Sequence, residues 1–533
     1  MRNRSSSSTQ SGIPVVDLFA GAGGLGEGFS ALGADSAPPF DVCLSIEKDA
    51  IACATLALRK YVRQFSRLPD EFAGYFSGEL SRQRLFDTFP DEAQRAQHAT
   101  WQAELGKVAP QLVTRRVKMA VGGRRDWVLL GGPPCQAYSM IGRARMRGTR
   151  ADFESDERHF LYREYLRIVA DHEPAIFVME NVKGLLTSSH GGGRIVTRIL
   201  EDLWRPAAAV GNTRNRGLTY RLYGLGPRDS ALPWEGSGRP PDGEEFLLQA
   251  EDVGIPQTRH RLFIVGVRSD VPGRPAELQR RPEVTAGAVL SDLPSLRSIL
   301  SRGEDSLGRW REAVAEILTY DWMSAAPETT LGRVAREIRK VVRELRKSQL
   351  DCGAEYTRGS PSPGALRDWY RPNAVGLTHH VARAHMRDDL HRYLFATSFA
   401  EIHGRSPKLR DFPEELHPSH QNVARAVLGN MFEDRFRVQM ADRPATTITS
   451  HVSKDGHYYI HYDARQCRSL TVREAARLQT FPDSYFFEGN RTEQYRQVGN
   501  AVPPLLAREI ARVVYDLLAA VRRSSGRVAV LSR

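Results

Sequence analysis

The chain has 533 residues, of which 41% are apolar, and its 75 Lys and Arg against 63 Asp and Glu give a net charge of +12. This length predicts two or more domains. Five cysteines without paired spacing exclude a disulfide framework and a CxxC zinc site, and no apolar stretch approaches the length of a membrane span. We therefore expect a cytoplasmic chain with no metal site and no membrane partner.

The positive charge favours a polyanionic partner, because clustered Lys and Arg gain free energy by displacing counterions from phosphates. Only nine of the basic residues are Lys. Such an excess of Arg can equally reflect a genome-wide compositional bias, so the charge alone leaves the class of partner open.

The first predicted unit is a strand, a turn and a helix. It follows the Ser-rich residues 1–12, which we expect to form a flexible tail. A short strand at residues 15–19 runs into AGAGGLGEGF, a glycine-rich turn that opens a helix as in dinucleotide-binding sites. About twenty residues later, Glu47 ends a second apolar strand, where a carboxylate can accept both ribose hydroxyls. This combination predicts a nucleoside cofactor.

The next region, residues 50–126, is predicted to be mostly helical and polar, and we assign no chemistry to it. Glu79 could approach an adenine, but a solvated helix start explains it equally well. An apolar strand then ends abruptly in WVLLGGPPCQAYS, residues 127–139. Cys135 thus follows the carboxyl end of a buried strand, which is the edge where α/β sheets bind ligands. A lone cysteine there is more often a small buried hydrophobe than a nucleophile.

Three further segments follow in the chain. Residues 140–156, with four arginines, predict either a basic loop that closes over a phosphate backbone or a solvated charge run. After a predicted helix at residues 157–171, a buried strand delivers Glu180 to the edge that holds Cys135, so the two can act as proton donor and nucleophile. Residues 222–244 are predicted to form a surface insertion.

Two arginines then precede an apolar strand. Arg259 and Arg261, with Gln257, lie in an extended segment, where residues two apart point the same way. Two cations aimed at one face favour an oxygen-rich ligand over a salt bridge.

Six stretches occur in the order DLFAGAGGLGEGF, GGPPCQAYS, ENV, PQTRHR, LTVREAARLQTFPDSY and QVGNAVPP. Together they resemble the motif set of the bacterial cytosine-5 DNA methyltransferases, over residues 15–268 and 443–514. The resemblance implies an α/β fold, with a doubly wound, mostly parallel, Rossmann-like methyltransferase sheet and a smaller inserted target-recognition domain. The expected catalytic domain is residues 13–268 plus 465–533, and the expected target-recognition domain is residues 269–464.

The resemblance also implies S-adenosylmethionine as cofactor and S-adenosylhomocysteine as product. Phe19 is expected near the adenine and Glu47 at the ribose, although Lys48 replaces the aromatic or apolar residue of many members. The full expected cofactor set is Phe19, Gly21, Ala22, Gly23, Gly24, Glu47, Lys48, Pro134, Leu161, Asn500 and Val502.

For catalysis, the resemblance implies that Cys135 adds to carbon 6 of a flipped cytosine, Glu180 acts at N3 and Arg261 holds O2. The expected DNA contacts are Gln136, Ser139, Arg143, Arg145, Gln257 and Arg259. The base that removes the carbon-5 proton is not assigned.

Between residues 269 and 442 the motifs stop. Residues 331–347 predict an amphipathic helix whose basic face we interpret as solvated, and His379–His380 and Ser450–His451 are polar pairs that could reach DNA. Duplex DNA is the expected partner, with a cognate restriction endonuclease or other defence proteins as further candidates.

Two other functions stay open. A tRNA cytosine-5 methyltransferase would use the same motifs, although an insert of this size favours DNA. An inactive DNA-binding subunit of a defence complex is the second alternative. The presence of Cys135, Glu180 and Arg261 argues against it, since an inactive site has no chemical reason to keep all three.

Overall fold

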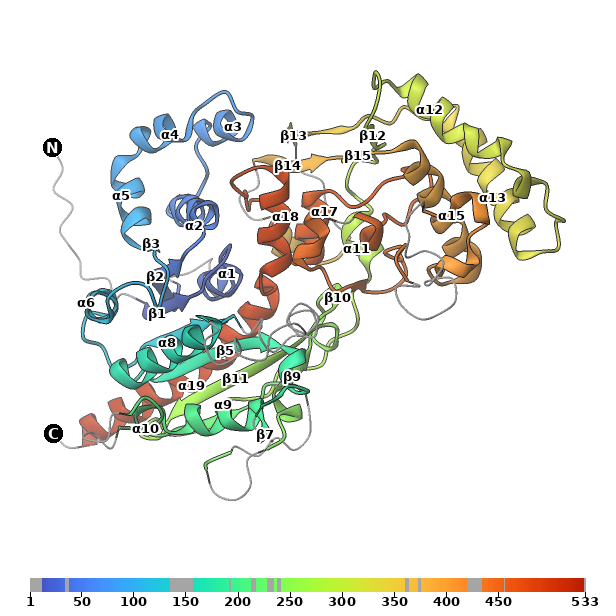
Figure 1. Ribbon diagram of the computed structural model, residues 1–533. Coiled ribbons are helices and arrows are strands. Elements are labelled where there is room, and N and C mark those ends of the chain that lie inside the picture. Colours follow the sequence, from blue (N-terminus) through green and yellow to red (C-terminus); the bar gives the residue numbers. More distant parts are fainter. Residues whose placement is uncertain are drawn as a thin grey trace.

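The chain forms a lobe built on a sheet and a second lobe that carries α12, α13 and α15 (Figure 1). The computed structural model describes residues 12–33, 38–134, 157–190, 193–211, 217–227, 234–236, 241–359, 364–371, 375–418, 434–454 and 456–531. Within these ranges, no helix combines the length and the apolar character needed to cross a membrane.

A mostly parallel sheet forms the centre of the first lobe. Its strands are β1 (Ile13–Leu18), β2 (Phe40–Glu47), β3 (Thr100–Gln102), β4 (Val128–Gly131), β5 (Ile176–Val182), β8 (Tyr220–Tyr223), β9 (Leu247–Gln249) and β11 (His260–Arg268). Their order is β3-β2-β1-β4-β5-β11-β8, with β9 also paired to β11. Neighbours from β3 to β5 are parallel, and β11 is antiparallel to its three neighbours. The predicted mostly parallel α/β sheet is confirmed.

Helices cover both faces of this sheet, as a doubly wound fold requires. The helices of this lobe are α1 (Gly24–Ala31), α2 (Ala50–Val62), α3 (Glu71–Phe76), α4 (Arg82–Thr88), α5 (Pro90–His98), α6 (Pro110–Val121), α8 (Glu157–His172), α9 (Ile195–Trp204), α10 (Pro206–Ala209) and α19 (Pro504–Leu531). Successive strand residues point to opposite faces. Val15 and Leu130 therefore join the core with α1 and α19, whereas Val16 and Leu129 join the core with α6, α8 and α9.

Two glycines of α1 allow the end of the chain to return to its start. A Cβ on Gly24 would lie 2.1 Å from the Val502 carbonyl oxygen, and one on Gly28 would lie 2.4 Å from the Ala507 Cβ. Any side chain at these positions would push the C-terminal segment away from α1. The glycine-rich stretch therefore serves packing as well as the turn.

One sequence prediction in this lobe needs correction. Leu222 is buried in β8 and paired with Gly266 of β11, so the sheet extends into the predicted surface insertion. The prediction that residues 50–126 are mostly helical is confirmed by α2 to α6, and the region also contains the short strand β3. Its pairing with β2 makes it the edge of the sheet.

The second lobe has a hydrophobic core of its own. Its main elements are α12 (Leu307–Ala315), α13 (Thr330–Leu345), β13 (Gly353–Arg358), β14 (Gly376–Val381) and α15 (Arg387–His403). The apolar residues of α11 (Ala286–Leu290), α17 (Val472–Leu478) and α18 (Arg491–Asn500) belong instead to the core that includes α1 and α19. Apolar residues of α12, α13 and α15 pack together, with Trp310, Ile338 and Leu394 fully buried. The predicted amphipathic helix is confirmed as α13, and its Arg and Lys face outward.

Helix α17 joins the late part of the chain to this lobe through buried arginines (Figure 1). Arg477 donates to both carboxylate oxygens of Asp483, at 2.9 and 2.7 Å, and to Asp292 at 2.6 Å. Arg473 donates to the carbonyl oxygen of Thr378 at 3.0 Å. These contacts join residues on both sides of the expected domain boundary at 464/465.

The buried Arg477 pair gives a stability prediction. Arg477→Met should lower the free energy of unfolding by about 3–5 kcal/mol, because Asp483 would keep a buried charge without its partner. Chemical denaturation measures this change. Arg302→Met, at an exposed arginine of the same lobe, should change it by less than about 0.5 kcal/mol. Equal effects of the two substitutions would contradict a structural role for the ion pair.

The two histidines expected near DNA are buried instead. His379 and His380 are only 1% and 2% exposed. A ring nitrogen of His379 accepts the backbone N–H of Phe487, and the His380 ring contacts Thr471 Oγ1 and the Pro294 carbonyl oxygen. Both rings therefore stabilise the lobe from inside, and the prediction that they reach DNA is wrong. His451 is exposed.

Candidate active site

A cavity of about 550 Å³ opens at the carboxyl ends of β1, β2, β4 and β5. Ten of the eleven expected cofactor residues line it: Phe19, Gly21, Ala22, Gly24, Glu47, Lys48, Pro134, Leu161, Asn500 and Val502. The exception, Gly23, caps α1 in a left-handed conformation with φ 83°. A pocket of this size, lined by apolar residues together with charged and polar side chains, suits a cofactor.

The turn after β1 is strained where it meets the cavity. Phe19 has a positive φ of 55°, which is unusual for a residue with a bulky side chain. The backbone N–H of Ala20 donates to the Ile46 carbonyl oxygen at 3.1 Å, which ties the turn to β2. Strain of this kind is typical of ligand-binding segments, so it supports the expected place of the Phe19 ring at the cofactor.

The Glu47 carboxylate holds together the two loops that frame the cavity. Its Oε2 accepts the Gly21 N–H at 2.8 Å, and its Oε1 accepts the N–H groups of Lys48 and Asp49, both at 2.9 Å. Each carboxylate oxygen has further lone pairs, so these bonds leave capacity for hydroxyl donors. The side chain is thus oriented at the cavity before any ligand binds.

The sequence resemblance implies S-adenosylmethionine as the ligand, and Glu47→Ala should then weaken its binding by about 1–3 kcal/mol, the scale for a lost hydrogen bond to a charged group. Isothermal titration calorimetry measures the change. Glu79→Ala is the matched control, because Glu79 is exposed and does not line the cavity. An unchanged affinity in Glu47→Ala, or an equal loss in both variants, would place the ribose elsewhere.

Several cavity residues were missed by the sequence analysis. Glu104 and Leu105, directly after β3, line the cavity, so the acidic residue on this side is Glu104 and not Glu79. The sequence TWQAEL, a short strand followed by an acid, was the available indication. Asp49 and Arg496, also in the lining, form an ion pair of 2.7 Å between α2 and α18.

Asp17, at the end of β1, is another missed residue of the lining. It is 1% exposed, and burial raises the pKa of its carboxyl to about 7, although the Lys60 ammonium opposes this shift. A carboxyl group that titrates near neutral pH beside a cofactor pocket is an unusual feature of the site.

The other end of the same cavity holds the expected proton donor. Because β4 and β5 are adjacent and parallel, the Gly132–Pro134 segment lies beside Glu180, and all of these residues line the cavity. A Cβ on Gly132 would lie 3.1 Å from Glu180 Oε2. The Asn181 amide donates to the Pro133 carbonyl oxygen at 3.3 Å and helps to fix the segment that leads to residue 135.

An arginine from β11, which is not itself part of the cavity lining, contacts Glu180. Arg261 Nε lies 3.2 Å from Glu180 Oε1, and both side chains are less than one-fifth exposed, at 18% and 15%. Antiparallel pairing sets this contact, since Arg261 pairs with Val182 and Phe263 with Glu180. The structure thus brings together the expected proton donor and the residue expected to hold O2.

Two residues expected to contact DNA, Gln257 and Arg259, form hydrogen bonds inside the protein instead. Gln257 is fully buried and bridges the carbonyl oxygen of Leu478 and the N–H of Ile448. Arg259 is 3% exposed and donates to the Ile448 carbonyl oxygen at 2.8 Å. Burial, reinforced by the Arg261 charge, lowers the pKa of Arg259 to about 9. The alternation of residues along this segment did not predict that Arg259 would be buried without an acidic partner. In the structure, the hydrogen bonds of Gln257 and Arg259 link the two lobes.

The remaining predicted residues lie outside the described part of the chain, which ends at Pro134 before this gap. They are Cys135, Gln136, Ser139, Arg143 and Arg145.

Comparison with known proteins agrees with this geometry. The model of the C-5 cytosine-specific DNA methylase family matches residues 124–205 and 244–516. The Type II methyltransferase M.Bpa9945I of Bacillus paralicheniformis is 31% identical, over 95% of this chain and 99% of the relative. The Type II methyltransferase M.AgeI of Thalassovita gelatinovora is 26% identical, over 94% of this chain and 99% of the relative. The DNA (cytosine-5-)-methyltransferase M.ApeKI of Aeropyrum pernix is 27% identical, over 74% of this chain and 82% of the relative.

Proposed function

Because the chain belongs to the C-5 cytosine-specific DNA methylase family and is a DNA (cytosine-5-)-methyltransferase, we propose that its methyl donor is S-adenosylmethionine. The observation that carries this proposal is the single cavity that joins the glycine-rich turn and Glu47 to Pro134 and Glu180. The residues fit the group, with an aromatic ring, a glycine-lined backbone and a carboxylate for the ribose. When bound, S-adenosylmethionine would supply the methyl group.

We propose the following roles for the protein's own residues. The Cys135 thiolate adds to carbon 6 of the target cytosine and makes carbon 5 nucleophilic. Glu180 protonates or hydrogen-bonds N3, which favours this addition, and Arg261 holds both Glu180 and the cytosine O2. The target carbon is inaccessible inside a duplex, so the base must be flipped into the cavity.

The second lobe supplies the candidate surface for sequence recognition. We assign target recognition to residues 269–464, with the buried arginines of α17 anchoring this segment to the rest of the chain. Gln136, Ser139, Arg143 and Arg145 are proposed DNA contacts. Since the relatives are named Type II methyltransferases, a cognate restriction endonuclease is the proposed functional partner.

The decisive assay compares methyl transfer from labelled S-adenosylmethionine to duplex DNA and to tRNA. Label should enter the DNA at cytosine, and bisulfite sequencing of DNA from cells that express the protein should identify one methylated sequence. Label in tRNA alone would mean that the protein is a tRNA cytosine-5 methyltransferase. Binding of DNA without transfer to either substrate would support an inactive subunit.

A further inference from the structure

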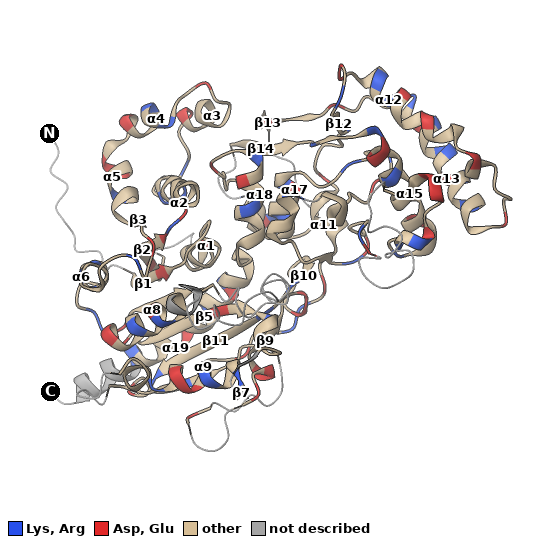
Figure 2. Cartoon of the chain, in the orientation of Figure 1, with Lys and Arg blue, Asp and Glu red and all other residues tan. Residues whose placement is uncertain are grey.

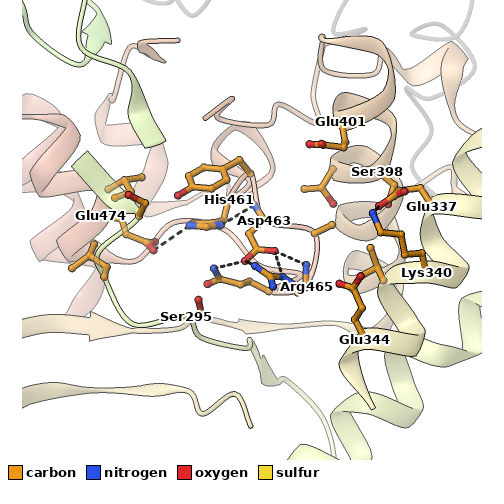
Figure 3. Close-up of a pocket in the computed structure, with 18 of the residues that line it drawn as sticks. Ser295, Glu337, Lys340, Glu344, Ser398, Glu401, His461, Asp463, Arg465 and Glu474 are labelled. Carbon is orange, nitrogen blue, oxygen red and sulfur yellow. Dashed lines mark hydrogen bonds and ion pairs between the residues drawn. The ribbon is translucent and has the colours of Figure 1, made fainter. Parts of the chain in front are cut away.

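A second cavity, of about 420 Å³, lies in the other lobe and shares no lining residue with the candidate active site. Its walls come from α13, α15 and the segments 290–295 and 461–466, with Glu474 of α17 on one side (Figure 3). Elements from four separate parts of the sequence thus meet around one partly open cavity, in which Glu344 and Glu401 are exposed to solvent.

This cavity is acidic in a chain of net charge +12. Three of its carboxylates are neutralised by ion pairs: Glu337–Lys340 at 3.0 Å, Asp463–Arg465 at 2.9 Å and Glu474–Arg468 at 2.6 Å. The carboxylates of Glu344 and Glu401 have no hydrogen bond or ion pair with any residue that the structure describes. Lys340 and Arg465 attract these carboxylates without forming an ion pair with them, and the five carboxylates still outnumber the cations, so the walls keep a net negative charge.

Ser398 shows independently that a polar partner is missing. Its side chain is 0% exposed and lines the cavity, and its Oγ has no hydrogen bond within the described part of the chain. Buried hydroxyl groups are normally paired, so this one favours a bound donor or acceptor. Ser398 and Glu401 lie three residues apart on α15, which places them on one helix face.

The remaining lining suits a hydrocarbon chain. The rings of His461 and Tyr462 stack with their centroids 4.4 Å apart, and Leu293 and Val341 are buried apolar residues of the walls. Figure 3 shows Glu401 and Ser398 on α15 and Glu344 on α13 around the same space. In Figure 2, acidic and basic residues both occur on these two helices.

We propose that this cavity binds a small linear aliphatic diamine or polyamine. Its terminal ammonium groups pair with Glu344 and Glu401, one of them also donates to Ser398 Oγ, and its methylene chain packs on the apolar lining. Its two positive charges offset the net negative charge of the walls. A metal ion suits the site less well, because no group of three or more His, Cys, Asp or Glu side chains among the described residues could hold one.

Calorimetric titration of the full-length protein with 1,4-diaminobutane, without DNA or cofactor, tests this site. The diamine should bind, 1-aminobutane should bind about tenfold more weakly or worse, and neutral 1,4-butanediol should not bind. Binding of the diol as tightly as the diamine, or no binding of the diamine, would overturn the proposal. Tighter binding of Mg²⁺ than of the diamine would also overturn it.

Conservative variants locate the binding site. Glu344→Gln and Glu401→Gln should each weaken diamine binding about tenfold, and the double variant should also lose the rise in melting temperature that the diamine causes in the unchanged protein. Glu328→Gln, at an exposed position of the same lobe outside the cavity, is the matched control. Far-ultraviolet circular dichroism checks that each variant is folded. Unchanged diamine affinity in a folded double variant would refute the assignment.

Discussion

Cys135→Ser is expected to abolish methyl transfer and the covalent attachment of the protein to DNA. A serine hydroxyl is hardly ionised near neutral pH and lacks the nucleophilicity of a thiolate. Pro134, the described residue directly before it, lines the cavity beside Glu180. The loss should therefore affect chemistry and not the binding of DNA, whose phosphate and base contacts do not involve sulfur.

The covalent step can be trapped with 5-fluorocytosine at the target site. The fluorine cannot leave carbon 5 as a cation, so the methylated base should stay attached to the enzyme. Denaturing electrophoresis should show a protein–DNA species only when S-adenosylmethionine is present, and none with Cys135→Ser. An adduct that persists in this variant would mean that another residue attacks the base.

Cys352→Ser is the matched control for this experiment. Cys352 is a partly exposed cysteine of the second lobe and does not line the active-site cavity. Burial raises the pKa of its thiol to about 11, so it is a poor nucleophile at neutral pH. The control should form the adduct as the unchanged protein does.

Glu180→Gln is expected to lower the single-turnover rate of methyl transfer by about 10²- to 10⁴-fold, the usual contribution of a general acid. Glutamine keeps the size of the side chain and can donate a hydrogen bond to N3, but it cannot transfer a proton. Because Glu180 also contacts Arg261 at 3.2 Å, Glu180→Ala should be slower still. Quenched-flow measurements of methyl transfer at saturating DNA and cofactor separate the rate from binding.

The control for Glu180 is Glu201→Gln, at an exposed position of α9. It should leave the rate within about twofold of the unchanged protein, since surface substitutions have small effects. A rate for Glu180→Gln within tenfold of the unchanged protein would remove Glu180 as the proton donor. Arg261 would then be the remaining candidate to stabilise the attacked ring.

The local patterns of the chain were sufficient to predict strands β1, β2, β4, β5 and β11 of the sheet and one side of its cavity. Strand β1 and the turn after it need only an apolar run and glycines whose backbone fits a positive φ, which are properties of adjacent residues. The same holds for β4, which ends in Gly-Gly-Pro-Pro, and for Glu180 in β5. Parallel pairing of β4 with β5 then brings their ends together.

Tertiary contacts decided the remaining features, because each depends on partners far away in sequence. Glu104 reaches the cavity only because β3 pairs with β2, and Arg259 is buried only because Ile448 offers its carbonyl oxygen from 189 residues away. His380 is buried for the same kind of reason, between Thr471 and Pro294. Alternation and charge report which side chains share a face, but burial of a polar group depends on whether distant atoms can satisfy it.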